Sequence, residues 1–119
     1  MGGHTTYDYD GETAVVTGST KGIGRGIAAG LADANANVVV NSRSASDVTS
    51  AAAELDDRGT GRVIGVPADV ASTDEIAQLL DRAIEEFGRI DLLVNNAAGR
   101  PEAESVREAT VDAGETTLP

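Results

Sequence analysis

The stretch Thr17-Gly18-Ser19-Thr20-Lys21-Gly22-Ile23-Gly24 decides the fold of this chain. It follows the apolar run Ala14-Val15-Val16 and precedes a helical pattern that begins near Ile23, so a strand, a glycine-rich turn and a helix start come in that order. The free N–H groups at a helix N-terminus bind anions, and glycines let the backbone approach a pyrophosphate closely. The spacing Gly-x-x-x-Gly-x-Gly therefore predicts a dinucleotide phosphate site, and an ordinary glycine-rich loop is the alternative.

The rest of the chain alternates strand and helix patterns. Apolar runs predict buried strands over residues 13–17, 38–41, 62–66 and 90–94. Helices are expected over 23–33, from Ser44 to a stop at Gly59, and from a capping box of Ser72 and Glu75 to a stop at Gly88. The third helix carries the clearest apolar stripe: Ile76, Leu79, Leu80, Ala83, Ile84 and Phe87. Right-handed crossovers then predict an α/β fold, a doubly wound parallel sheet of order 3-2-1-4 with a cofactor crevice between strands one and four.

The composition limits the class of protein. The chain has 119 residues, of which 40% are hydrophobic, so we expect one domain over 11–119 after a flexible lead-in over 1–10. Cysteine is absent, which excludes disulfides and thiolate chemistry. Neither an apolar run of membrane-spanning length nor a signal-peptide pattern occurs, so we expect a cytoplasmic protein. His4 is the only histidine and is expected to be an exposed tail residue, so no metal site is predicted.

The charge is strongly acidic. Asp and Glu number 20 against 9 Lys and Arg, which gives a net charge of −11, and Lys21 is the only lysine. Nucleic acid and anionic membranes are therefore excluded as partners. The acids are scattered along the chain, which is typical of a solvated, self-repelling surface. A sharper hypothesis is a halophile-like adaptation, because concentrated salt would screen that repulsion.

Two motifs resemble one known family. Residues 17–24 closely resemble the Thr-Gly-x-x-x-Gly-Ile-Gly signature of the short-chain dehydrogenase/reductase family, and Asn95-Asn96-Ala97-Ala98-Gly99 resembles its second motif, at the end of the fourth expected strand. The resemblance covers about residues 10–118. It implies a Rossmann-like nucleotide-binding fold and a parent reaction that transfers a hydride between a nicotinamide cofactor and a carbonyl or alcohol.

The resemblance also implies roles for single residues. Asn95 matches the asparagine that ties the sheet to the cofactor loop, and Ala97 and Gly99 match residues that line the ribose on the nicotinamide side. Asp69 and Val70 resemble the family's Asp-Val pair, whose acid accepts a hydrogen bond from the adenine amino group. The alternative for Asp69 is an acid that merely precedes a helix.

The residues after the second strand bear on the choice of cofactor. NAD-binding relatives place an acid there, which binds both ribose hydroxyls and repels a 2′-phosphate. This chain has Asn41, Ser42 and Arg43 instead, and a guanidinium grips a phosphate by two parallel hydrogen bonds. Lys21 also lies where NADP-preferring relatives carry a basic residue. We therefore expect a preference for NADP(H), with NAD(H) as the second choice; a merely solvated Arg43 is the alternative.

The catalytic half of the family pattern is not found in these 119 residues. The family uses a tyrosine with a lysine four residues on, a serine and an asparagine. The only tyrosines, Tyr7 and Tyr9, are followed four residues later by Gly11 and Thr13, and Lys21 lies in the phosphate turn. We therefore expect the N-terminal part of an NADP-dependent oxidoreductase that is inactive by itself and has no catalytic residue of its own.

Alternatives from other classes remain. The chain could be a non-catalytic nucleotide-binding or partner-binding module, an inactive gene remnant. A phosphate-binding NTPase is disfavoured because Lys21 precedes Gly22 rather than following the last glycine. Residues 100–102 are expected to form a turn and 110–118 to begin another helix. The fold would then stop after about four strands, leaving strand four as a bare apolar edge that could recruit a second copy or a complementing chain.

Overall fold

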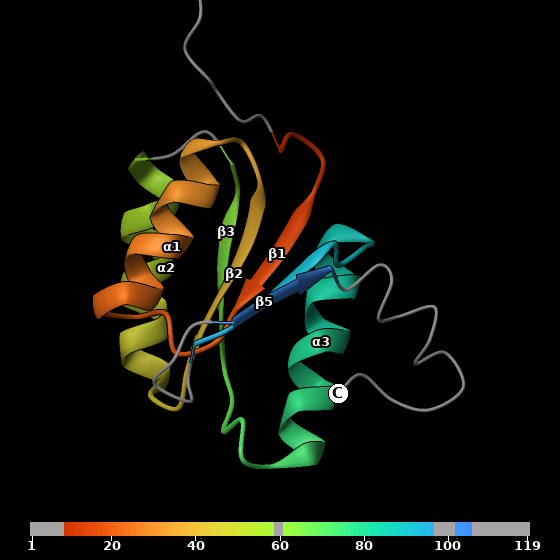
Figure 1. Ribbon diagram of the computed structural model, residues 1–119. Helices are drawn as coiled ribbons and strands as arrows, with labels where there is room; N and C mark the ends of the chain where they lie inside the picture. Colours follow the sequence, from red (N-terminus) through yellow and green to blue (C-terminus); the bar gives the residue numbers. More distant parts are fainter. Residues whose placement is uncertain (1–8, 59–60, 97–101, 106–119) are drawn as a thin grey trace, which may run out of the picture.

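The computed structural model describes residues 9–58, 61–96 and 102–105, which form one five-stranded sheet and three helices (Figure 1). The elements in chain order are β1 Thr13–Val16, α1 Gly22–Asp33, β2 Asn37–Ser42, α2 Ala45–Arg58, β3 Val63–Pro67, α3 Thr73–Phe87, β4 Leu92–Asn95 and β5 Glu102–Ser105. The strand order is β3-β2-β1-β4-β5, with the first four strands parallel and β5 antiparallel to β4. The expected doubly wound α/β fold and its order 3-2-1-4 are confirmed.

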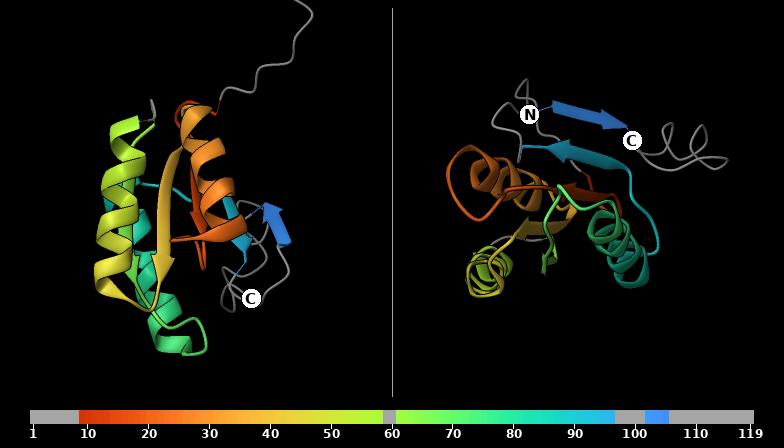
Figure 2. Two further views of the ribbon diagram at one scale, coloured as in Figure 1. Left: turned by 90° about the vertical axis from the view of Figure 1, so that its left-hand side faces the viewer. Right: turned by 90° about the horizontal axis from the view of Figure 1, so that it is seen from below.

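Helices cover both faces of the sheet, α1 and α2 on one face and α3 on the other (Figures 1 and 2). Because side chains alternate along a strand, neighbouring residues of β1 enter different cores. Val16 packs in a cluster with Ala28 of α1 and Leu55 of α2, whereas Val15 packs in a cluster with Leu79 of α3. Burial on both faces is the reason why these strands are continuously apolar.

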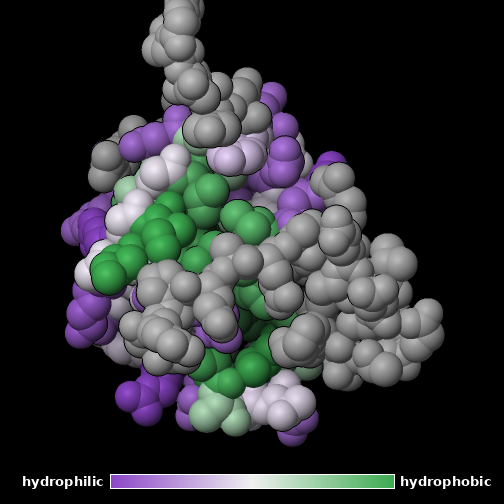
Figure 3. All heavy atoms as spheres, viewed as in Figure 1, coloured by the Kyte–Doolittle hydropathy of each residue, from purple (hydrophilic) through white to green (hydrophobic). Residues whose placement is uncertain are grey.

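Helix α1 turns its smallest side chains to the sheet. Its buried residues are Gly24, Ala28 and Ala32, one every four positions, so the helix axis can lie close to the strands. Ile27 is half-buried beside them, whereas Ile23 is 66% exposed. A band of apolar residues crosses the face of the molecule seen in Figure 1 (Figure 3). Because α1 lies close to the strands, its first turn lies against the glycine-rich turn that precedes it.

The expected helix starts are confirmed at α2 and α3, with one change. The Ser44 hydroxyl accepts a hydrogen bond from Asp47 N (3.2 Å), and the Ser72 hydroxyl accepts one from Glu75 N (3.3 Å). The second hydrogen bond expected in the capping box does not form, because the Glu75 carboxylate does not accept from the backbone N–H of Ser72. It accepts instead from Asp69 N at 2.8 Å, while Ser72 N donates to Asp69 O at 2.9 Å. Helix α3 ends as expected at Gly88, whose φ of 83° favours glycine.

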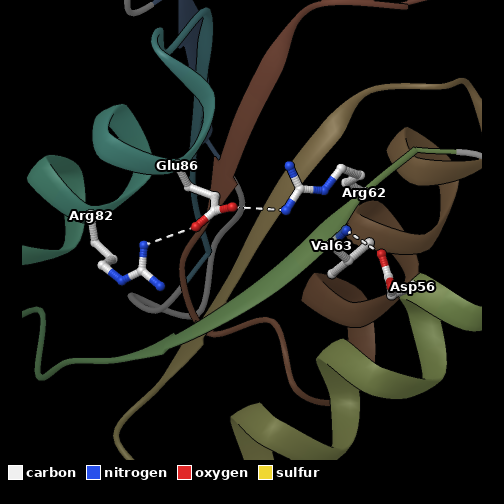
Figure 4. A network of polar contacts seen from close by, with 5 residues as sticks. All are labelled: Asp56, Arg62, Val63, Arg82 and Glu86. Carbon is white, nitrogen blue, oxygen red and sulfur yellow. Dashed lines mark hydrogen bonds and ion pairs between the residues drawn. The ribbon is translucent and has the colours of Figure 1, made fainter.

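Polar contacts hold the outer strand β3 to the helices on both of its sides (Figure 4). Arg62, just before β3, donates to Glu86 of α3 at 2.8 Å, and Arg82 donates to the other carboxylate oxygen of Glu86 at 3.2 Å. The hydrogen bond from Arg62 and then that from Arg82 hold the pKa of Glu86 below its ordinary value of 4.5. On the opposite side, Asp56 of α2 accepts from Val63 N at 2.8 Å. These contacts fix the strand that leads into the loop with Asp69.

Two expectations about surfaces are wrong. Strand β4 does not present a bare edge, because Asn95 pairs with Glu102 and Leu92 with Ser105 of β5. Glu102 is thus part of a strand rather than of a turn, and the edge of β4 on which the expected partner contact depended is already paired within the chain. On α3, Ile84 was expected in the apolar stripe facing the sheet but is 47% exposed.

Several expectations lie outside the described residues. They concern the lead-in up to residue 8 with His4, the stop at Gly59, Arg100 and Pro101 of the expected turn, and the helix over 110–118. Within the part of the chain that the structure describes, no helix is long and apolar enough to span a membrane.

Candidate nucleotide-binding site

The glycine-rich turn joins β1 to α1 and leaves the start of the helix open. Lys21 is the N-cap residue of α1, but its side chain makes no capping hydrogen bond, and the first turn of the helix contains no acidic residue. The backbone at Gly18 (φ 59°) and Gly22 (φ 64°) lies in the left-handed region that side chains rarely adopt. The free N–H groups and positive dipole end of α1 therefore face outward without a competing anion from the helix itself.

Gly24 brings the turn and the helix into contact. A Cβ at this position would lie 3.0 Å from Ser19 Cα and closer still to Gly18 O and Asn96 Nδ2. Since no side chain fits there, only glycine allows α1 to start this close to the turn. This is the reason for the last glycine of the motif.

Ser19 supports the turn from inside. Its side chain is fully buried, and its hydroxyl donates to Val16 O at 2.6 Å and accepts from Asn41 N at 2.8 Å. Ser19 N donates to Asn41 O, also at 2.8 Å. The sequence singled out Ser19 as a residue of the phosphate turn, and the structure places its side chain on the interior side of that turn. Thr20 is half-buried, and Lys21 and Ile23 are exposed at the surface.

Asn41 is a functional candidate that sequence reasoning misplaced. The sequence grouped it with Ser42 and Arg43 opposite the ribose, but its side chain is only 1% exposed. Its Oδ1 accepts from Gly18 N at 3.3 Å, and its Nδ2 donates to Val66 O at 3.0 Å and Ala68 O at 3.2 Å. A buried amide directly after the apolar run Val38-Val39-Val40 was the signal that could have revealed this role.

Asn95, the last residue of β4, and Asn96, directly after it, share the role that the sequence gave to Asn95. Asn95 Oδ1 accepts from the Thr17 hydroxyl at 3.3 Å, and the same hydroxyl accepts from Asn96 N at 3.0 Å. The direct tie to the glycine turn is made by Asn96, whose Nδ2 donates to Gly18 O at 2.9 Å. Thr17 and Asn96 are therefore site residues that the sequence reasoning missed, although both lie inside its motifs.

A cavity of about 370 Å³ opens where β1, β2 and β3 end. Its walls come from three separate segments and are formed by Gly18, Asn41, Ser42, Arg43, Ala68, Asp69, Val70 and Ala71. The structure thus brings together four residues that the sequence selected from two different loops. Asp69 also shapes its own loop, because its carboxylate accepts from Ala71 N at 2.9 Å. Ala97 and Gly99 lie outside the described residues.

A parallel sheet, an open helix start behind a glycine turn and a cavity across the carboxyl ends of the strands together define the class of Rossmann-type nucleotide-binding proteins. The comparisons with known proteins specify the family. A family model described as short chain dehydrogenase matches residues 12–118. The chain belongs to the short-chain dehydrogenase/reductase family, whose members are oxidoreductases that bind NAD(P).

Individual relatives agree with this assignment. The chain is 41% identical over 93 residues to a dehydrogenase/reductase SDR family member 4 from Caenorhabditis elegans, covering 78% of this chain and 36% of that protein. It is 42% identical over 90 residues to glucose 1-dehydrogenase 2 of Bacillus subtilis (strain 168), covering 76% and 35%. Among solved structures, L-sorbose reductase from Gluconobacter frateurii, complexed with NADPH and L-sorbose, gives a TM-score of 0.74 at 35% identity and covers 78% of this chain and 35% of that one. The chain thus spans little more than a third of the length of these relatives.

Proposed function

We propose that this chain binds NADP(H) and forms the N-terminal cofactor-binding part of an oxidoreductase that transfers a hydride between NADPH and a carbonyl or alcohol. The observation that carries the proposal is the 370 Å³ cavity, into whose wall the ends of β2 and β3 bring Arg43 and Asp69 beside Gly18 of the phosphate turn. Cofactor binding needs these groups on one surface, although they are up to 51 residues apart in sequence, from Gly18 to Asp69. The proposal is also supported by the NADPH bound in L-sorbose reductase.

Each wall of the cavity suits one part of the cofactor. Arg43 is exposed at the rim, where its guanidinium can bind a 2′-phosphate in a bidentate manner, and the Ser42 hydroxyl lies beside it. Lys21 is exposed and stands where NADP-preferring relatives carry a basic residue, so it would add a second positive charge near the same phosphate. Asp69 and Val70 form the adenine end, where the carboxylate can accept from the adenine amino group. The open N-terminus of α1 takes the diphosphate.

The chain's own residues bind and orient the nucleotide and do not move a proton. In the family pattern the proton comes from a tyrosine whose pKa is lowered by a lysine four residues on, while a serine holds the substrate oxygen. We propose that these groups belong to sequence outside the 119 residues, consistent with the short share of each relative that the chain covers. Turnover would then need that sequence as well.

Titration of the chain with NADPH and NADH, followed by heat or by nucleotide fluorescence, tests the proposal. We expect saturable binding of both with a preference for NADPH. In Arg43→Asp, loss of a charge-assisted bidentate contact weakens the binding of NADPH by about 10- to 100-fold and reverses the preference for NADPH over NADH. Arg82→Asp is the matched control, because it makes the same charge change on the exposed side of α3.

Three results would contradict parts of the proposal. A folded chain that takes up neither nucleotide would refute cofactor binding. An unchanged NADPH-to-NADH ratio in Arg43→Asp would refute the choice of NADP(H). Turnover of a carbonyl substrate by the chain alone would refute the placement of the catalytic groups elsewhere.

A further inference from the structure

We propose that Asn41 is a positioning residue that couples the two halves of the nucleotide site, so that the adenine loop and the phosphate turn act as one rigid unit. The inference rests on the proposed function. It concerns a residue that would not touch the nucleotide directly through its amide, since its side chain is 1% exposed and its hydrogen-bonding groups face other parts of the protein.

The contacts of Asn41 join the two segments that, in the proposed function, bind different parts of a dinucleotide. Toward the phosphate turn, its Oδ1 accepts from Gly18 N, and its backbone N and O both bond to Ser19. Toward the adenine loop, both of its amide hydrogens are used, on Val66 O and Ala68 O. Asp69 and Val70 follow Ala68 directly and line the same cavity as Gly18.

The geometry explains why an amide is needed. The carbonyls at the end of β3 need a donor, whereas the N–H of Gly18 needs an acceptor, and Asn supplies both from one rigid plane. Removing either partner would leave a buried polar group unsatisfied. Because one planar group makes all three bonds, a shift of the adenine loop must move or break the contact with the turn. The distance between the two half-sites is therefore set by Asn41.

Asn41→Asp separates the two functions of the side chain. A carboxylate still accepts from Gly18 N but cannot donate to Val66 O or Ala68 O, so the adenine loop is released while the turn is kept. Two ligands measure the coupling: NADPH, which spans both halves, and adenosine 2′-phosphate, which lacks the 5′-phosphates and occupies only the adenine end. In the wild-type chain, the dissociation constant of adenosine 2′-phosphate divided by that of NADPH reports how much the phosphate-turn half of the site adds to binding.

We expect Asn41→Asp to lower this ratio by about tenfold, because the loss of roughly one to two hydrogen bonds leaves the two halves of the site less well preorganised for NADPH. Asp91→Ala is the matched control. Asp91 is also buried at a strand end, and its carboxylate accepts from Thr13 N at 2.9 Å, but it lies outside the residues that form the cavity. The control should lower the melting temperature and leave the ratio unchanged. Equal losses for both ligands in Asn41→Asp, as a purely structural role predicts, would overturn the inference.

A second measurement uses the wild-type chain alone and does not depend on the variant's folding. Ser19 N is buried, bonds to Asn41 O and lies outside the walls of the cavity. Adenosine 2′-phosphate should therefore slow hydrogen exchange at Ser19, although the ligand carries no group for the phosphate turn. Unchanged exchange at saturating ligand would overturn the coupling while leaving the proposed function intact. A wild-type chain that binds neither ligand would overturn both.

Discussion

Replacement of Gly24 by alanine tests the central geometric claim about the turn. In an ordinary helix this change is favourable by about 0.5–1 kcal/mol. At Gly24 the added methyl group would meet Ser19 Cα at 3.0 Å and approach Gly18 O and Asn96 Nδ2 more closely still. Overpacking costs about 1–3 kcal/mol, and displacing Asn96 would remove its 2.9 Å hydrogen bond to Gly18 O, which is worth about 1 kcal/mol. We therefore expect a net loss of about 2 kcal/mol.

Two other glycines of α1 provide the controls for Gly24→Ala. A Cβ at Gly26 or at Gly30 would have no neighbour within 4 Å, so alanine there should stabilise the helix. For a domain of this size, 2 kcal/mol corresponds to a fall in Tm of about 8–10 °C, whereas each control should raise it by about 2–5 °C. Thermal unfolding followed by circular dichroism measures both, and NADPH titration should show weaker binding in Gly24→Ala alone. A Tm for Gly24→Ala equal to that of Gly26→Ala would refute the close-approach argument.

Three further predictions concern stability. The Thr13 hydroxyl is buried and has no hydrogen-bond partner among the described residues, so Thr13→Val should raise the free energy of unfolding by about 1 kcal/mol in denaturant titrations; a lower value would contradict this. The pKa of Glu86 is lowered in the folded state by Arg62 and Arg82, so its stabilising contribution is present above its unfolded pKa of about 4.5 and is lost as the pH falls through the folded value. The difference in Tm between wild type and Glu86→Gln should therefore shrink from about pH 6 to pH 3, and a constant difference would count against the network. The net charge of −11 predicts a higher Tm in about 1 M KCl, where the screening length is about 3 Å, than in dilute buffer; equal midpoints would argue against the self-repelling surface.

Much of the site could be predicted from the sequence, but not the way in which it is held together. Ser42, Arg43, Asp69 and Val70 were selected at the ends of two predicted strands, and all four line one cavity. The prediction succeeded because the carboxyl ends of parallel strands lie at the same edge of a sheet. Asn41 stands directly before Ser42 yet faces inward, because successive residues of a strand point to opposite sides.

The errors have a common origin in contacts between distant segments. The pairing of β4 with β5 could not be inferred from the short polar run Glu102–Ser105, because a strand at the edge of a sheet needs no apolar pattern. Ile84 fits the helical period of the buried stripe but is exposed, since α3 lies against the sheet along Leu79, Leu80 and Ala83. Glu75 accepts from Asp69 N instead of completing the capping box, and the Ser72 N–H that the box would use donates to Asp69 O.

The sequence by itself determined the three helices, the four parallel strands and the glycine turn, because each depends on periodicity or on residues within one short segment. The tertiary structure decided which polar side chains hold that turn. Gly18 bonds Asn41, 23 residues away, and Asn96, 78 residues away. Such partners follow from strand order and register, which bring β2 and β4 to either side of β1, and no local pattern encodes the distances between them.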